Sequence, residues 1–331
     1  MMTMTGPSMW ASQLVRPRTF VEVEVPRLRA DDLVDGEVLL RVRAGAVCGS
    51  DLPIFEGLRT LKQRDDPTTD NVPGSPMHEV VGEVLASRDP RHRVGDHVVG
   101  WGSRLNALAE LAVSLGDDLA SFDPQLAPEH AVMLQPLACV LYAVEQIPDV
   151  AGSRAAVLGQ GPMGLLFNHA LRSAGATSVT GVDRLDRVDL GRRMGADEVV
   201  QLHTSRWVGG LAATERPKVV VEAIGHNVST LDHAIEAAAP GGRIFYFGIP
   251  DDAYYPVNMQ SLLRKNLALI SGVTLQRREM LAKASSYLSA HPELLDSFVT
   301  DTFDRDGAQQ AYELATAPSP TTAKVTLRMS P

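Results

Sequence analysis

From residue 151 onward, short apolar segments alternate with helix-length segments, and this alternation constrains the fold of the chain more than any other feature. The predicted strands cover residues 155–158, 179–182, 218–221, 243–247 and 267–272, and the predicted helices cover residues 164–174, 187–194 and 230–239. Repeated β-α-β units form a parallel sheet with helices on both faces. We therefore predict an α/β fold with a doubly wound domain in this half of the chain.

A glycine-rich turn, Gly159-Gln160-Gly161-Pro162-Met163-Gly164, joins the first of these strands to the first helix. The first glycine permits a tight turn, the second lets a pyrophosphate approach the backbone, and the third lets helix and strand pack closely. The helix N-terminus attracts phosphates, and Pro162 costs little there because its missing N–H would be unpaired anyway. We predict a dinucleotide site that includes Gly159, Gly161, Pro162, Met163 and Gly164. A helix-capping turn without a ligand is the alternative.

Asp183 follows the next predicted strand, at the spacing of the acidic residue that accepts hydrogen bonds from the adenosine ribose. A carboxylate there repels a 2'-phosphate and favours NAD over NADP, whereas Arg184 could accommodate that phosphate. Gly248 and Val273, each directly after a later predicted strand, complete the residues expected to contact the cofactor.

Before about residue 148, short apolar runs are separated by Gly, Pro and Asp, which predicts a β-rich module. Cys48 lies shortly after the predicted strand 38–44, and His78-Glu79 directly precede the strand 80–85. Each residue alone could be structural, since a lone Cys is commonly buried and a His-Glu pair is commonly a surface pair. Their place at strand ends favours a zinc site with Cys48, His78 and Glu79 as ligands and one open position, as in catalytic sites.

Composition excludes several classes of function. The 331 residues suffice for about two domains. A net charge of -9 argues against a nucleic-acid partner, which would favour a basic surface. Because no apolar stretch of about 18 residues and no signal-peptide pattern occurs, we expect no membrane partner and a cytoplasmic location. Two cysteines are too few for a disulfide framework or a structural zinc cluster of three or four cysteines.

These motifs resemble the zinc-containing medium-chain dehydrogenase/reductase family, and in particular its polyol and threonine dehydrogenase-like branch. The resemblance covers nearly the whole chain and rests on residues 47–51, 76–82, 94–98, 135–138, 159–164 with Asp183, and 241–243. It implies a GroES-like β-rich catalytic domain over residues 1–148 and a Rossmann NAD-binding domain over residues 149–290. Residues 291–331 are expected to return to the catalytic domain.

The resemblance also implies roles for individual residues. Cys48, His78 and Glu79 match zinc-ligand positions, Ser50 matches the hydroxyl that relays the substrate proton, and Asp51 matches an acid that orients the histidine. The implied reaction is hydride transfer between NAD and a secondary alcohol or its ketone, where the alcohol is a polyol, cyclitol, sugar or amino-alcohol. A homodimer or homotetramer is implied as well.

Three departures from the family pattern bear on the metal. The family's lobe of four cysteines is absent after Trp101, so no second, structural zinc is expected. Gln135 and Tyr142 stand where many relatives have a glutamate and a histidine, and Met77 replaces the usual glycine before the histidine. A neutral amide is a poor zinc ligand, so we expect water near Gln135 in the fourth position.

Two alternatives remain open at the level of the sequence. One is a zinc-free reductase of the quinone or enoyl type with the same two domains, and the other is a catalytically silent NAD-binding protein. Substrate selectivity is expected to depend on the loop 56–76, with Phe55 and Trp101 as either pocket walls or packing residues.

Overall fold

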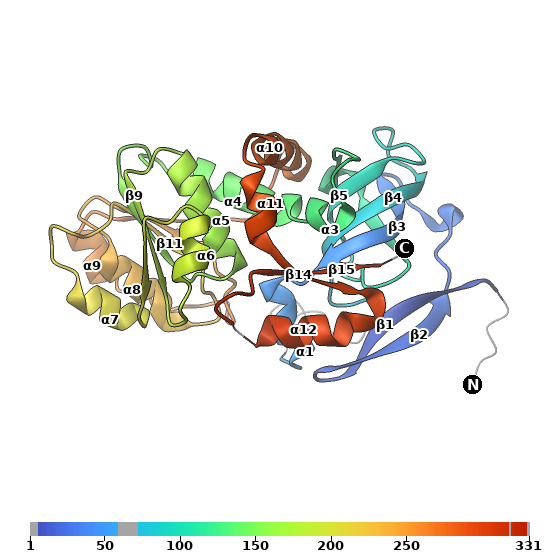
Figure 1. Cartoon of the computed structure of the whole chain (residues 1–331), viewed down its shortest axis with the longest axis horizontal. Helices are drawn as coiled ribbons and strands as arrows, with labels where there is room; N and C mark the ends of the chain where they lie inside the picture. The colour runs from blue at the N-terminus through green and yellow to red at the C-terminus, as the bar shows by residue number, and fades with distance from the viewer. Residues whose placement is uncertain (1–5, 59–71, 318, 330–331) are drawn as a thin grey trace. The chain divides into compact units, whose positions relative to one another are not determined.

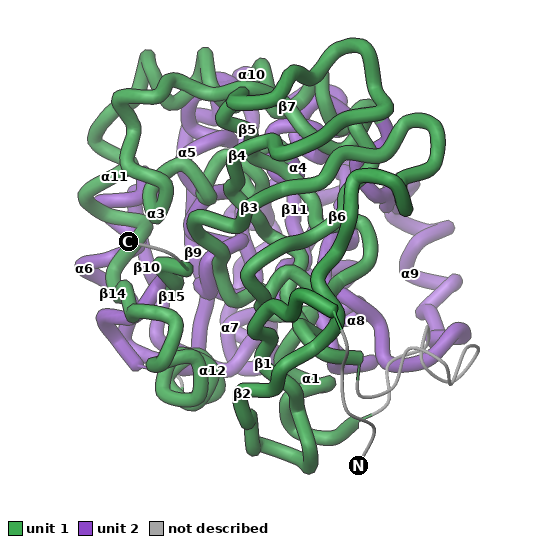
Figure 2. Tube along the Cα trace, turned by 90° about the vertical axis from the view of Figure 1, so that its right-hand side faces the viewer, with its two compact units in different colours: residues 1–138, 276–318, 324–331 green, residues 139–275, 319–323 purple. Residues whose placement is uncertain are grey.

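The computed structural model describes residues 6–58, 72–317 and 319–329 (Figure 1). The chain divides into two compact units, which Figure 2 shows in green and purple. Unit 1 comprises residues 1–138, 276–318 and 324–331, and unit 2 comprises residues 139–275 and 319–323. None of the helices in the described ranges is long and apolar enough to cross a membrane.

Unit 2 contains a parallel sheet with the strand order β10-β9-β8-β11-β12-β13. The strands are β8 (Arg154–Leu158), β9 (Ser178–Asp183), β10 (Glu198–Gln201), β11 (Val219–Glu222), β12 (Arg243–Tyr246) and β13 (Ala268–Ser271). The helices are α5 (Pro162–Ser173), α6 (Val188–Arg193), α7 (Thr204–Gly210), α8 (Val228–Ala237) and α9 (Met259–Arg264). This order is that of a doubly wound dinucleotide-binding fold, so the predicted fold class is confirmed.

Unit 1 contains a mixed sheet with the order β14-β15-β3-β4-β5-β7, to which β6 adds by pairing with β3, and a separate β1-β2 hairpin. The strands are β1 (Ser8–Arg16), β2 (Thr19–Pro26), β3 (Glu37–Ala46), β4 (Glu79–Ser87), β5 (His97–Trp101), β6 (Leu111–Leu115), β7 (Leu119–Ser121), β14 (Val299–Asp304) and β15 (Lys324–Arg328). Its helices include α1 (Leu52–Phe55), α3 (Pro128–Ala131), α10 (Arg277–Ala290), α11 (Glu293–Phe298) and α12 (Ala308–Thr316), and α4 (Leu134–Glu145) begins in it. The strand β15 pairs antiparallel with β3 (Figure 1).

Three aromatic rings hold α12 against the N-terminal part of unit 1. Phe20, Phe55 and Tyr312 pack with ring centroids 5.0 to 5.4 Å apart. Phe55 and Tyr312 are fully buried. Phe55 is therefore a packing residue, and its alternative interpretation as a pocket wall is wrong.

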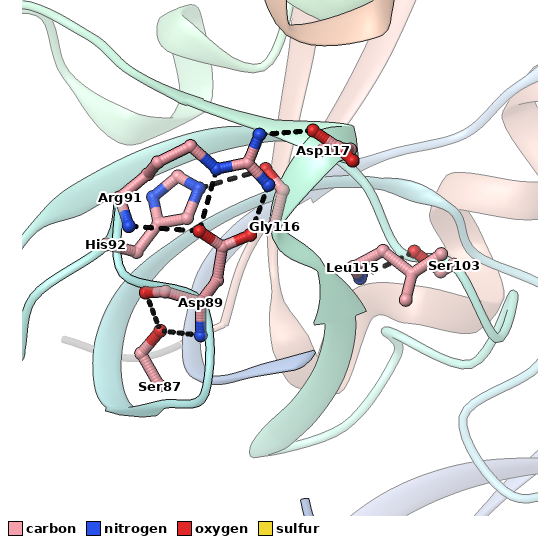
Figure 3. A network of polar contacts seen from close by, with 8 residues as sticks. All are labelled: Ser87, Asp89, Arg91, His92, Ser103, Leu115, Gly116 and Asp117. Atoms are coloured by element: carbon pink, nitrogen blue, oxygen red, sulfur yellow. Dashed lines mark hydrogen bonds and ion pairs between the residues drawn. The ribbon is translucent and has the colours of Figure 1, made fainter. Parts of the chain in front are cut away.

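A polar network joins the turn after β4 to the turn between β6 and β7 (Figure 3). The backbone N–H and the Nε of Arg91 donate to Oδ1 of Asp89 at 3.0 and 2.7 Å, and the guanidinium also contacts Asp117. The ring Nε2 of His92 donates to the carbonyl of Gly116 at 2.9 Å. A Cβ at Gly116 would lie 2.1 Å from Asp89, so this close approach requires glycine. Hydrogen bonding to Arg91 outweighs burial and lowers the pKa of Asp89 from 3.8 to about 2.

The lowered pKa of Asp89 predicts a loss of stability in acid. The carboxylate stabilises the fold above its unfolded pKa, and this contribution, about 2 kcal/mol, is lost as the pH falls through the folded value. We expect urea unfolding between pH 5 and pH 2 to show a smaller acid-dependent loss in Asp89→Asn than in the wild type. The exposed Asp31 is the control, and Asp31→Asn should behave like the wild type. Equal acid dependence of all three proteins would contradict the prediction.

Candidate functional site

The ends of two paired strands bring the three predicted zinc ligands together in unit 1. Cys48 follows β3, and His78 and Glu79 lie at the start of β4, where Ala46 is paired with Glu79. Because β3 and β4 are antiparallel, the end of one adjoins the start of the other. One ligand atom each of Cys48, His78 and Glu79 lies within 4.8 Å of the other two.

Asp51 connects two of these residues. It belongs to a short 3-10 helix, η2 (Gly49–Asp51), and its side chain is almost completely buried. The backbone N–H of Cys48 donates to Oδ2 of Asp51 at 3.0 Å, and Nδ1 of His78 lies 3.0 Å from Oδ1. Since a carboxylate only accepts hydrogen bonds, Nδ1 carries a hydrogen and Nε2 is the ring atom left for a metal.

The charges around His78 bear on how a metal would bind. Burial alone lowers the pKa of His78, but the charges of Asp51 and Cys48 outweigh burial and raise this pKa well above its usual value. The metal-free imidazole is therefore held as a cation beside Asp51. A metal has to displace this proton, so binding at this site releases protons.

A buried ion pair holds the third ligand residue. Nζ of Lys324, the first residue of β15, donates to Oε1 of Glu79 at 2.6 Å, and the two side chains are only 2% and 1% exposed. Burial raises the pKa of Glu79, and the attraction of Lys324 opposes this change. For Lys324, the attraction of Glu79 and other nearby acidic groups overcomes burial and raises its pKa. For Glu79 burial prevails over this attraction, and its pKa stays raised.

The second carboxylate oxygen of Glu79 is suited to a cation. Oε2 is buried and has no hydrogen-bond partner among the described residues. A buried, unpaired carboxylate oxygen is costly, and a metal ion would remove that cost. The set of thiolate, imidazole and carboxylate is the chemistry of a catalytic zinc site, so these residues fit the ion that the sequence predicts.

Two contacts hold the segment that carries His78. The hydroxyl of Tyr312 donates to the carbonyl of Pro76, so the aromatic cluster of α12 anchors this segment. Met77 is fully buried, and a Cβ at Gly45 of β3 would lie 2.2 Å from its sulfur. The absence of a side chain at Gly45 therefore accommodates the methionine that departs from the family pattern.

The remaining predicted residues of unit 1 lie on elements around this cluster. Ser50 is half-buried in η2, between Cys48 and Asp51, and Gln135 is buried in the first turn of α4. Trp101 is opposite Glu79 in the β4–β5 pair and packs under the guanidinium of Arg277, whose carbon lies 5.0 Å from the ring centroid. Residues 59–71 of the expected selectivity loop lie outside the described residues.

The glycine loop of unit 2 makes a tight turn into the helix that follows it. Gly159 has a φ of +92°, which favours glycine, and a Cβ at Gly164 would lie 1.8 Å from the carbonyl oxygen of Gly159. A Cβ at Gly161 would meet no atom within 4 Å, so the space beside it is open. Pro162 is the first residue of the 12-residue helix α5, and Met163 follows it. Gly159 thus allows the turn and Gly164 the close packing of helix and strand, while the ligand approach at Gly161 stays a prediction.

Asp183 lies beside this loop, at the end of β9. Its Oδ2 accepts the backbone N–H of Gln160 at 2.7 Å, and its Oδ1 accepts that of Leu185 at 3.0 Å. The side chain of Arg184 is exposed.

The other two predicted cofactor residues follow β12 and β13. Gly248 cannot carry a side chain, because its Cβ would lie 2.2 Å from the backbone nitrogen of Gly225. Val273 is 70% exposed. Because β12 is parallel to the other strands of the sheet, Gly248 lies at the same carboxyl edge as the glycine loop and Asp183. Doubly wound folds bind their ligands at this edge.

Comparison with known proteins gives two family matches. Residues 34–111 match the alcohol dehydrogenase GroES-like domain, and residues 128–326 match the glucose dehydrogenase C-terminus. The chain is 26% identical to D-arabinitol dehydrogenase 1 of Uromyces fabae, over 95% of this chain and 96% of that protein. It is 25% identical to L-threonine 3-dehydrogenase of Bacillus subtilis, over 84% of this chain and 87% of that protein.

Solved structures have the same fold. An alcohol dehydrogenase from Thermus sp. ATN1 superposes with a TM-score of 0.81 at 25% identity, covering 97% of this chain and all of that one. The 2R,3R-butanediol dehydrogenase of Bacillus subtilis superposes with a TM-score of 0.79 at 21% identity, over 98% of this chain and all of that chain.

The buried pair of Glu79 and Lys324 predicts a large effect of removing the lysine. Lys324→Met leaves the carboxylate buried without its cation, so we expect the metal-free protein to lose about 3–5 kcal/mol of unfolding free energy. The double variant Glu79→Leu/Lys324→Met removes both charges and should recover most of this loss. Denaturant unfolding followed by circular dichroism measures both. A single variant as stable as the wild type would contradict the prediction.

Proposed function

Because the chain belongs to the zinc-type medium-chain alcohol dehydrogenase family, we propose that its substrate is a polyol, cyclitol, sugar or amino-alcohol with a secondary alcohol group. The protein is an oxidoreductase that transfers a hydride between a secondary alcohol and a nicotinamide cofactor. The observation that carries the proposal is the cluster of Cys48, His78 and Glu79, in which one carboxylate oxygen is buried without a partner.

We assign the three zinc-ligand positions to Cys48, His78 and Glu79, which would hold the ion. When bound, zinc supplies Lewis acidity toward an alcohol or carbonyl oxygen, and the nicotinamide accepts or donates the hydride. Asp51 orients the His78 ring, and Lys324 holds Oε1 of Glu79, so that Nε2 and Oε2 remain for the metal. The protein thus orients the ligands before the metal binds.

Ser50 is the residue we assign to proton transfer. The hydroxyl lies on η2, between the first ligand and the acid that orients the second, and it is half-buried. A hydroxyl can accept a proton from the substrate while it donates its own proton outward. Oxidation of the alcohol releases one proton and one hydride, and Ser50 carries the proton.

We propose NAD as the preferred cofactor. The carboxylate of Asp183 lies at the end of β9, where the backbone N–H groups of Gln160 and Leu185 orient it. A carboxylate so placed accepts hydrogen bonds from ribose hydroxyls and repels a 2'-phosphate. Arg184 is the residue that would favour NADP, and it is exposed.

We also propose a cytoplasmic location. Cys48 has to remain a thiol or thiolate to bind a metal, and this suits a reducing compartment such as the cytoplasm.

The test of the function combines metal analysis with turnover. Protein purified without chelator should contain one zinc per chain and reduce NAD in preference to NADP with members of a panel of polyols, sugars and aminocyclitols. Ser50→Ala should retain zinc and dinucleotide binding and lose about a hundredfold in kcat. Ser205→Ala, at an exposed serine of α7, is the control and should keep the wild-type rate.

Different results support the two alternatives. Turnover that survives complete removal of the metal would favour a zinc-free reductase of the quinone or enoyl type. Binding of NADH without reduction of NAD by any alcohol of the panel would favour a catalytically silent NAD-binding protein. An unchanged kcat in Ser50→Ala would contradict the proton relay alone.

We further propose that two copies of the chain associate through the edge of the parallel sheet. The edge strand β13 leaves Leu269 40% exposed, and the neighbouring α9 leaves Met259 and Leu263 66% and 78% exposed. Edge strands with exposed apolar side chains are templates for pairing. The molecular mass measured by light scattering should be twice 35.7 kDa, or four times 35.7 kDa if two dimers form a tetramer. Leu269→Lys should lower the mass, and a wild-type mass of one chain would contradict the proposal.

A further inference from the structure

Two amide side chains pair in the core of unit 2, directly beneath the glycine loop. Gln160, the second residue of the loop, and Asn168 of α5 are both fully buried. Nδ2 of Asn168 donates to Oε1 of Gln160 at 2.6 Å, and Nε2 of Gln160 lies 3.3 Å from Oδ1 of Asn168. The amides therefore satisfy each other in a place where an unpaired amide would be costly.

The surroundings of Gln160 are shaped around its side chain. Its Nε2 also donates to the carbonyls of Val157 and Gly159, at 3.3 and 3.2 Å. A Cβ at Gly181 of β9 would lie 2.5 Å from the Gln160 amide, and one at Gly191 of α6 would lie 3.2 Å from Oε1. Glycine on the neighbouring strand and helix thus leaves the space in which this amide lies.

The backbone of the same residue reaches the ribose side of the dinucleotide site. The N–H of Gln160 donates to Oδ2 of Asp183 at 2.7 Å, and the adjacent N–H of Gly159 donates to the carbonyl of Val182 at 2.8 Å. Gln160 is therefore held from the inside by its side chain, while its backbone orients the acidic residue. A shift of its peptide would move the pyrophosphate turn and Asp183 together.

We propose that the Gln160–Asn168 pair positions the dinucleotide site by fixing the glycine loop and the Asp183 carboxylate before the cofactor binds. Asn168 acts through Gln160 and is a positioning residue. A site ordered in advance loses less conformational freedom on binding, which raises affinity. The inference rests on the proposed binding of NAD.

The test separates positioning from stability. Asn168→Leu removes the partner of Oε1, and we expect the Kd for NADH and the KM for NAD to rise about tenfold, with kcat at saturating NAD within about twofold. The melting temperature of the cofactor-free protein should fall. In Gln160→Leu/Asn168→Leu no amide is left unpaired, so stability should recover while NADH affinity stays low. Ile235→Ala, at a buried core residue of α8, is the control for destabilisation alone and should keep the wild-type Kd.

Each outcome has a definite meaning. Wild-type affinity in Asn168→Leu, or recovery of affinity together with stability in the double variant, would overturn the positioning role, because the pair would then only fill space. A wild-type protein that binds neither NADH nor NADPH would instead overturn the proposed cofactor chemistry on which the inference rests. Zinc content, measured in every variant, should stay unchanged, since the metal ligands lie in unit 1.

Discussion

The register of three strands in unit 1 is the constraint on which the cluster of Cys48, His78 and Glu79 depends. β3 pairs antiparallel with β4 on one side and with β15 on the other, and Ala46 is opposite both Glu79 and Thr326. This register places Cys48 just beyond the end of β3, next to the starts of the strands that carry Glu79 and Lys324. A slip of one residue would turn a side chain to the opposite face and separate the buried charges. Because breaking such a pair is costly, the ion pair itself opposes any other register.

The sequence predicts the local parts of this arrangement and misses the parts made by distant segments. The glycine loop, Asp183 and the three ligand residues lie at strand ends that apolar patterns mark, so their places follow from short-range rules. Lys324 offers no such signal, since a lysine beginning a C-terminal strand is usually exposed. The packing role of Phe55 cannot be predicted from the sequence either, because its neighbours Phe20 and Tyr312 come from opposite ends of the chain.

Both sites use a buried polar pair to hold a functional group, but the pairs differ in charge. Beside Cys48 and His78 the pair is ionic, and it leaves Oε2 of Glu79 without a partner among the described residues. Beneath the glycine loop the pair is neutral, because Gln160 only has to hold a peptide in place. Burying a charge in that apolar core would cost far more free energy than burying an amide. A charge there would also change the electrostatic potential at Asp183.

The turn after β5 shows how the chain closes the region where the resemblance would put a lobe of four cysteines. Oγ of Ser103 donates to Asp118 at 2.8 Å and accepts the N–H of Leu115 at 2.9 Å. Arg277 at the start of α10 donates to the same carboxylate at 2.8 Å and covers Trp101. Hydrogen bonds and one ion pair therefore tie the turn to α10 without thiolates. With only two cysteines in the sequence, these contacts hold the turn in place of a thiolate cluster.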